Sequence, residues 1–249
     1  MHHVLPQDER TRAWSDCVNP LTIKPADSLV THPSLFSSIS PADRSVIVSP
    51  ARTKQLSHGE VLYFESDPVD QIFLITSGFV KINMLGQNGS MVIVRLCASG
   101  DLVDVADLLS GDKHCRMASA LRFCRALVWD ATTFKRLTAR FPTLRLNLLR
   151  TFTAHLAELE ERFREMATER VSLRVARQFL RLAEKIGQAK NGPVDICLSR
   201  EELAQMTGTT LFTVSRLVSS WEGRGIVKTR RGGVTICDGP TLRAGAEDA

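Results

Sequence analysis

The stretch that decides the fold is LRLNLLRTFTAHLAELEERFREMATERVSL, residues 144–173. Apolar residues recur in it at steps of three and four over more than two heptads, which is the pattern of a coiled-coil seam. Charged residues fill the outer positions, so only one narrow face of the predicted helix is apolar. The pattern predicts a helix that pairs with a second copy, with packing on its own domain as the alternative. The predicted dimerisation residues are Leu149, Phe152, Leu156, Leu159, Phe163 and Met166.

Charge and length limit the classes of protein that this chain can be. A net charge of +5 and a pI near 9.0 mildly favour an anionic partner. No apolar run is long enough to span a bilayer, so we expect a cytoplasmic protein with no membrane partner. The six cysteines, at positions 17, 97, 115, 124, 197 and 237, are too dispersed for a zinc finger or a disulfide scaffold.

The sequence before the seam predicts a β-rich domain. The runs VLYF, QIFLIT, FVKINML, MVIVRL and RALVW predict short strands between residues 55 and 130, separated by glycine-containing turns. Asn88-Gly89 predicts a hairpin with a two-residue primed turn, because both turn positions need positive φ. Ahead of the strands, Ser40 and Pro41 predict the start of a short helix.

The resulting fold class is α+β, with an N-terminal antiparallel β-roll of the jelly-roll type, a long dimerisation helix and a C-terminal winged helix-turn-helix. We expect a flexible arm over residues 1–30, the roll over 31–140, the helix over 141–168 and the DNA-binding domain over 169–249. An enzyme of the cupin type would need clustered histidine ligands for a metal, and the strands contain no His-x-His. We therefore expect no catalytic residues, no metal and no enzyme activity.

The most specific motif is LSREELAQMTGTTLFTVSRLVSSWEGRGIVKTRRGGVTI, residues 198–236. Ser199 and Glu202 form a capping box that predicts a helix beginning at Arg200. Gly208 follows at the turn, and Val214 and Leu217 face back into the helix pair. This spacing is typical of a helix-turn-helix, whose second helix lies in the DNA major groove.

The predicted DNA contacts lie on the second helix, its cap and the wing that follows. Thr209 or Thr210 caps the helix, where backbone N–H groups can bind a phosphate. Arg216 can donate two hydrogen bonds to a guanine, whereas Phe212 can contact a thymine methyl group or pack on the sugar. The full set is Thr209, Thr210, Leu211, Phe212, Thr213, Ser215, Arg216, Lys228, Arg230 and Arg231.

These motifs together resemble the Crp/Fnr family of transcription regulators, named for the cyclic-AMP receptor protein and the fumarate and nitrate reduction regulator. The resemblance covers about residues 35–238 and is carried by SHGEVLYFESDP, LITSGFVKI, SGDLV, the seam and GTTLFTVSR. It implies a homodimer on a two-fold symmetric operator in double-stranded DNA, a contact with RNA polymerase, and a signal passed from the roll along the helix. The hinge would lie near Thr168 and Glu169.

The sequence departs from the family where effectors bind. The positions matching the cyclic-AMP cassette are Val105, His114 and Cys115, and Leu159 and Glu160 replace the hydroxyls that reach the base, so cyclic AMP is not expected. One cysteine before the roll is too few for the iron-sulfur cluster of the oxygen-sensing branch. Haem ligation by His114 and Cys115 stays open, although Asp104 and Ala106 match the carbon monoxide sensor's ligands. The candidate effector pocket is Asp104, Val105, His114, Cys115, Arg116 and Glu160.

Two alternatives to an effector-controlled regulator remain from the residues. One is a haem- or redox-dependent gas sensor of the same family. The other is a roll that binds a ligand or protein, with only non-specific DNA affinity in the basic wing, which would fade steeply with salt. The sequence leaves the effector, the operator and the direction of regulation open.

Overall fold

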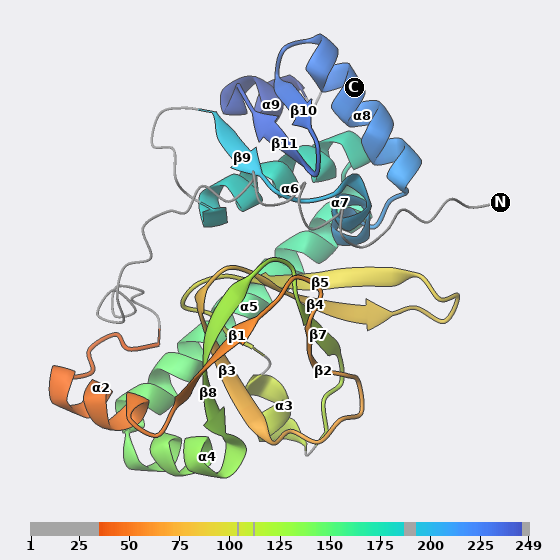
Figure 1. Ribbon diagram of the computed structural model, residues 1–249. Coiled ribbons are helices and arrows are strands. Elements are labelled where there is room, and N and C mark those ends of the chain that lie inside the picture. Colours follow the sequence, from red (N-terminus) through yellow and green to blue (C-terminus); the bar gives the residue numbers. More distant parts are fainter. Residues whose placement is uncertain (1–34, 104, 112, 187–192, 246–249) are drawn as a thin grey trace. The chain divides into compact units, whose positions relative to one another are not determined.

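The computed structural model describes residues 35–103, 105–111, 113–186 and 193–245 (Figure 1). The predicted N-terminal arm and Asp104 lie outside the described residues. The described residues form two compact units that divide after Phe163, within the long helix α5 (Pro142–Thr168). None of the described helices is both long enough and apolar enough to cross a bilayer.

The first unit is an antiparallel β-roll. One sheet has the order β1-β8-β3-β6 and the other β2-β7-β4-β5, and every pairing is antiparallel. The strands are β1 (Arg52–Leu56), β2 (Val61–Tyr63), β3 (Gln71–Ser77), β4 (Val80–Leu85), β5 (Met91–Cys97), β6 (Leu102–Val103), β7 (Met117–Ala120) and β8 (Cys124–Asp130). A buried cluster that includes Leu56, Phe73, Ile82 and Val128 fills the space between the sheets.

Helices close one end of the roll (Figure 1). They are α2 (Pro41–Val48), α3 (Val105–Ser110), α4 (Ala131–Arg140) and the first part of α5. The indole of Trp129 donates a hydrogen bond to the carbonyl oxygen of Ile47 at 2.8 Å, which ties β8 to α2. The buried amide of Asn147 donates to the carbonyl oxygens of Leu35 and Ser37, both at 2.8 Å, and so holds α5 to the segment before α2.

The predicted α+β class and all five predicted strands are confirmed, whereas β1, β6 and β7 were missed because they are short or lack a clear alternation. Ser40 caps α2 as predicted. The predicted two-residue turn at Asn88-Gly89 is wrong in detail. Gly86 N–H donates to the Ser90 carbonyl oxygen at 2.7 Å, so three residues form the turn, and of these only Gly89 has positive φ.

The second unit is a winged helix-turn-helix. It contains the end of α5, α6 (Val171–Ile186), α7 (Arg200–Thr207), α8 (Leu211–Gly223) and α9 (Gly239–Gly245). A three-stranded antiparallel sheet, β9 (Val194–Ile196), β10 (Val227–Arg230) and β11 (Gly233–Ile236), has the order β10-β11-β9. On α6, Val175, Phe179 and Leu182 are buried, and the Phe179 ring meets the Trp221 ring edge-on at 6.1 Å.

Ion pairs join the end of α5 to α6 within this unit. The guanidinium of Arg181 donates to both carboxylate oxygens of the buried Glu165, at 2.6 and 2.9 Å. One helical turn further on, Glu169 lies 3.2 Å from Arg177. A bidentate pair shielded from water resists screening and fixes orientation. The predicted hinge residues Thr168 and Glu169 therefore lie in a segment that these ion pairs hold against α6.

Candidate nucleic-acid interface and the cavity of the roll

The helix-turn-helix is built by local signals at both ends of its turn. The Ser199 side chain accepts from the Glu202 N–H and the Glu202 side chain accepts from the Ser199 N–H, so the predicted capping box is present. Gly208 ends α7 with φ of 61°, and a Cβ placed there would come within 2.9 Å of the Met166 methyl group. A side chain at this turn would meet both backbone strain and the end of α5.

The cap of α8 is Thr210 rather than Thr209. Its hydroxyl accepts from the backbone N–H of Thr213 at 3.1 Å and lies 2.9 Å from the Thr213 hydroxyl. Capping satisfies one of the N–H groups that the first turn of a helix leaves without a partner. The sequence did not decide which of the two threonines caps α8, because both stand just before its first apolar residue.

The two sides of α8 differ sharply. Val214, Leu217, Val218 and Trp221 are buried against the other helices, as was predicted for the first two. Arg216 and the large apolar side chains of Leu211 and Phe212 are exposed, Phe212 to 77%. Thr213 and Ser215 are half-buried at the edge of this exposed surface. A helix with one side in the core and a guanidinium on the other can enter a major groove without losing its packing.

The wing is fastened to α8 by one carboxylate. Glu222 accepts from the backbone N–H of Thr229 at 2.6 Å and from the Thr229 hydroxyl at 2.7 Å. These hydrogen bonds, the one from the hydroxyl first, lower the pKa of Glu222 below its ordinary value. The position of β10 relative to α8 is thus set by a polar contact between Glu222 and Thr229, which are seven residues apart in the chain.

The three predicted wing cations are placed differently. Lys228 and Arg231 are exposed. Arg230 is half-buried and points back to β9, where it donates to the sulfur of Cys197 at 3.0 Å and lies 3.4 Å from the Asp195 carboxylate. Gly233 next to it leaves no room for a side chain, because a Cβ would lie 2.6 Å from the Ile196 carbonyl oxygen.

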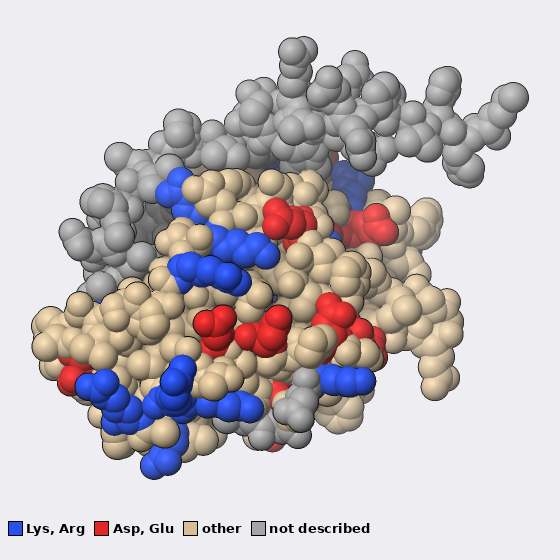
Figure 2. Space-filling view, turned by 60° about the horizontal axis from the view of Figure 1, so that its bottom comes forward, with Lys and Arg blue, Asp and Glu red and all other residues tan. Residues whose placement is uncertain are grey.

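Positive charge is not confined to the winged unit. From residue 131 to 157, through α4 and half of α5, the sequence has five lysines and arginines and no acidic residue, and all five are exposed. Figure 2 shows basic side chains gathered at the lower left of that view. Charge alone therefore does not locate a nucleic-acid interface on this chain, and the placement of Arg216 and the wing carries more weight.

The seam residues of α5 fall into two groups. Leu149, Leu156 and Phe163 follow one another at steps of seven and are 55%, 56% and 75% exposed. Leu159 and Met166 are about half exposed, whereas Phe152 is half-buried against the core that includes α2 and α4. Phe152 and Leu159 also line a cavity on the roll side of the helix. One side of α5 thus presents an apolar stripe, and the adjacent side closes the roll.

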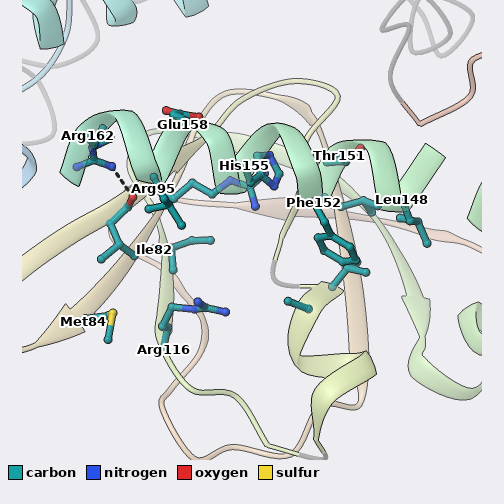
Figure 3. Close-up of a pocket in the computed structure, with 15 residues that line it drawn as sticks. Ile82, Met84, Arg95, Arg116, Leu148, Thr151, Phe152, His155, Glu158 and Arg162 are labelled. Carbon is teal, nitrogen blue, oxygen red and sulfur yellow. Dashed lines mark hydrogen bonds between the residues drawn. The ribbon is translucent and has the colours of Figure 1, made fainter. Parts of the chain in front are cut away.

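The cavity has a volume of about 250 Å³ and lies between α5, α3 and the strands β4 and β5 (Figure 3). The roll contributes apolar side chains that include Ile82, Met84, Val94, Leu102 and Val105. The helix contributes Leu148, Phe152 and Leu159. Charged and polar groups also line it, namely Arg95, Arg116, Thr151, His155, Glu158 and Arg162.

The predicted effector residues are only partly brought together. Val105 and Arg116 line the cavity, and Glu160 is exposed on α5 outside the lining. His114 also lies outside it, buried, with its ring stacked on Tyr63 at 3.5 Å. Cys115 is exposed. His114 therefore does not fit a haem iron, which needs an open space beside the imidazole nitrogen, and no step through haem is supported.

A buried aspartate organises this cassette. Asp107 on α3 accepts from the backbone N–H of Cys115 at 3.2 Å, and its other carboxylate oxygen lies 3.2 Å from Arg116. Its carboxylate also lies 3.4 Å from Nδ1 of His114. Three residues that the family resemblance assigned to an effector pocket, His114, Cys115 and Arg116, are thus held by this carboxylate.

The five cysteines of the described residues do not assemble a metal site, and Cys17 lies outside those residues. Cys97 and Cys124 are buried in the core between the sheets. Burial, and then the charge of Glu60, raise the pKa of the Cys124 thiol to about 12, so it stays protonated and binds metals poorly at neutral pH. Over the described parts of the chain, no three histidine, cysteine, aspartate or glutamate side chains come together as a metal-binding group.

Sequence reasoning missed Arg95, His155, Glu158 and Arg162. Nη2 of Arg95 on β5 lies 2.7 Å from Nε2 of His155 on α5, and Arg162 donates to the Val94 carbonyl oxygen at 2.6 Å. These pairs are separated by 60 and 68 residues, so no local motif contains them. Helical spacing is the signal that the sequence does contain. His155 follows Phe152 by three residues and precedes Leu159 by four, so the three side chains lie on one side of the helix.

The comparisons with known proteins agree with this geometry. Residues 53–141 match the cyclic nucleotide-binding domain and residues 173–244 match the Crp-like helix-turn-helix domain. A CRP-like cAMP-activated global transcriptional regulator of Mycobacterium tuberculosis is 22% identical over 218 residues, covering 87% of this chain and 97% of that protein.

Solved structures show the same fold. The c-di-GMP-responsive global regulator CLP of Xanthomonas campestris aligns with a TM-score of 0.70 at 15% identity, over 80% of this chain and 99% of that chain. A CRP/FNR-family transcriptional regulator of Thermus thermophilus aligns with a TM-score of 0.67 at 23% identity, over 79% and 98%. The chain therefore belongs to the Crp/Fnr family of transcription regulators, and it is a helix-turn-helix DNA-binding regulator rather than an enzyme.

Proposed function

We propose that the protein acts as a homodimer that binds a two-fold symmetric operator and regulates transcription through an effector held in the roll. The dimer forms through α5, which places two α8 helices about one DNA turn apart. The family resemblance implies a contact with RNA polymerase on the bound complex. An effector that binds one arrangement of α5 more tightly than another shifts the population that fits the operator.

One observation carries the proposal, which is the exposed apolar stripe on α5. Leu149, Leu156 and Phe163 leave more than half of their surface in water and recur at the heptad spacing. Exposed apolar side chains in a continuous line are typical of an interface, whereas scattered ones are not. A second copy supplies a matching heptad stripe in a parallel coiled coil, so the same surface covers both chains.

DNA recognition in this proposal uses the exposed side of α8. Arg216 reads a guanine, Phe212 contacts a thymine methyl group or a sugar, and the residues from Thr209 to Ser215 lie along the groove and the adjoining phosphate. Lys228 and Arg231 contact the backbone beside the groove. Arg230 contributes least, because its guanidinium is already held by Cys197 and Asp195.

The test is to put a charge into the stripe. In Leu156→Glu, each dimer buries two like charges in an apolar seam, and we expect the dimer to dissociate at least about 100-fold more readily, or roughly 2.7 kcal/mol. The matched control is Ala154→Glu, an exposed position on the outer side of the same helix. Light scattering on a size-exclusion column measures the mass, and fluorescence anisotropy measures affinity for operator fragments selected from genomic DNA.

The expected result is a monomer with weak operator binding for Leu156→Glu and a dimer with unchanged binding for Ala154→Glu. Wild-type operator affinity in a monomeric Leu156→Glu protein would refute the dimer mechanism. If the wild-type chain showed no preference among sequences at matched salt, the roll protein with only non-specific DNA affinity would be the better account.

A further inference from the structure

The roll cavity combines apolar walls with positive groups on one side. Its apolar lining comes from both the sheets and α5, as described above. Figure 3 shows Arg95 reaching beneath α5 toward His155, while Arg116 points into the space between the strands and the helix. The volume of about 250 Å³ lies just below the roughly 300–1,000 Å³ of common ligand pockets, so the occupant is small.

Among the arginines that line the cavity, Arg95 has a buried N–H group without a hydrogen-bond partner in the described part of the chain. Its Nε is shielded from water and has no hydrogen-bond partner among the described residues. Its Nη2 faces His155, and its ion pair with Asp101 is long, at 3.8 Å. A guanidinium has five N–H donors in a planar fork that matches a carboxylate, and a buried donor without a partner is costly.

The remaining charges indicate how much negative charge an occupant can bring. Arg116 is paired with Asp107 at 3.2 Å, and Arg162 donates to the carbonyl oxygens of Val94 and Ile93. Glu158 also faces the cavity and opposes a second negative charge. One unit of negative charge beside Arg95 is therefore compensated, whereas a dianion such as a terminal phosphate is not.

The apolar side of the lining is poorly suited to the sugar of a nucleotide. A sugar and a base need several hydroxyl, amide or carboxylate partners in fixed positions. The hydroxyl of Thr151 already donates to the Asn147 carbonyl oxygen at 2.9 Å. Val105, which matches a position of the family's cyclic-AMP cassette, has no polar side-chain atom to bind a ribose hydroxyl. Hydroxyl groups of a bound sugar would lose their water without gaining partners against Val105, Leu102 and Leu148.

We propose that this cavity binds a small monocarboxylate with an aromatic or branched aliphatic body. The carboxylate pairs with Arg95 beside His155, and the apolar body packs against Phe152, Leu148 and Val105. The inference rests on the proposed function, because the ligand acts as the effector through α5. Phe152 and Leu159 line the cavity, while Leu156 and Phe163 of the same helix belong to the stripe. A bound ligand therefore contacts the helix through which the two chains dimerise.

The experiment compares acids with their uncharged amides on the full chain. The pairs are phenylacetate and phenylacetamide, indole-3-acetate and indole-3-acetamide, and 4-methylpentanoate and its amide, with cyclic AMP as a further probe. Calorimetric titration measures affinity. We expect at least one acid to bind with a Kd below about 1 mM, and its amide at least about tenfold more weakly, because the amide lacks the charge.

Variants then assign the binding to this cavity. Arg95→Met keeps the length and apolar stem of the side chain, and we expect it to weaken binding of that acid by at least about tenfold. Arg136→Met is the matched control, since Arg136 is exposed on α4 outside the cavity. Thermal unfolding of each variant checks that the roll stays folded, and the acid and amide comparison on the wild-type chain needs no variant.

Several results would overturn the inference. They are no binding by any of the acids up to about 10 mM, equal binding of acid and amide, binding unaffected by Arg95→Met, or cyclic AMP binding more tightly than every acid. Dimer mass and operator affinity are measured on the same protein. A dimer that binds its operator but no acid rejects this inference alone, whereas a monomer that binds an acid rejects the proposed function.

Discussion

The winged unit and the roll cavity belong to one chain but are built by different means. In the winged unit, the cap at Thr210, the buried Val214 and the exposed Arg216 lie within seven consecutive residues. In the cavity, Arg95 on β5 meets His155 on α5, which lies 60 residues further along the chain. A surface that presents one helix depends on local order, whereas a cavity depends on the whole domain.

The largest effect concerns the core beneath α8. Trp221 is 1% exposed and meets Phe179 edge-on, so Trp221→Ala should destabilise the winged unit by about 3–5 kcal/mol. Urea unfolding followed by circular dichroism measures the loss. In a Trp14→Phe background, tryptophan fluorescence of this variant then reports on Trp129 in the roll. If the two units fold independently, the roll transition stays in place, and a shift of both transitions together would contradict the separation.

A smaller effect is expected on the exposed side of the same helix. Arg216→Ala should leave unfolding unchanged but cost about 1–3 kcal/mol of operator binding and relax sequence choice at one base pair. Arg224→Ala, an exposed arginine at the end of α8, is the control. Anisotropy with operator variants at matched salt separates a loss of specificity from a uniform loss. An equal loss on every sequence would assign Arg216 to a phosphate instead.

The smallest effect is a pH dependence at the wing. The folded-state pKa of Glu222 is lowered, mainly by the hydroxyl of Thr229, so this carboxylate stabilises the fold above its unfolded pKa of about 4.3 and loses that contribution as pH falls through the folded value. Glu222→Gln should therefore lose less stability than the wild-type chain as pH falls below about 4.3.

The measurement is urea unfolding at a series of pH values, with Glu201→Gln as the control, since Glu201 is an exposed carboxylate on α7. A pH dependence that is the same in the wild type and in Glu222→Gln would mean that the Thr229 contact does not hold the wing in solution. The result would then weaken the contrast between a locally ordered α8 and a wing that needs a tertiary contact.

The turn after β4 shows how far local signals reach. Asn88-Gly89 correctly located the hairpin, because a glycine with positive φ is needed somewhere in such a turn. The turn length depends on which residues of β4 and β5 face the core, and in this register Leu85 pairs with Met91. Gly86 and Ser90 close the turn, so three residues lie between them. Register is a property of two strands, so one stretch of sequence does not decide it.

The candidate effector residues show the opposite limit. The family resemblance selected His114, Cys115 and Arg116 as candidate effector residues. They are neighbours in the chain, but their side chains point in different directions. His114 is stacked on Tyr63, Cys115 is exposed and only Arg116 lines the cavity. A loop reverses direction within a few residues, so adjacency there says little about which side chains share a space. The polar groups that share the cavity with Arg116 come from β5 and α5, namely Arg95, Thr151, His155, Glu158 and Arg162.

The sequence by itself determined the α+β class, the five main strands, the capping box and the exposed side of α8, because each depends on periodicity or on hydrogen bonds within a few residues. Only the tertiary structure decided that Arg230 turns back to β9, that Glu222 holds the wing, and that Arg95 and His155 meet in a cavity. Those contacts depend on strand register and on which side of α5 faces the roll, and both are set by the packing of the whole domain.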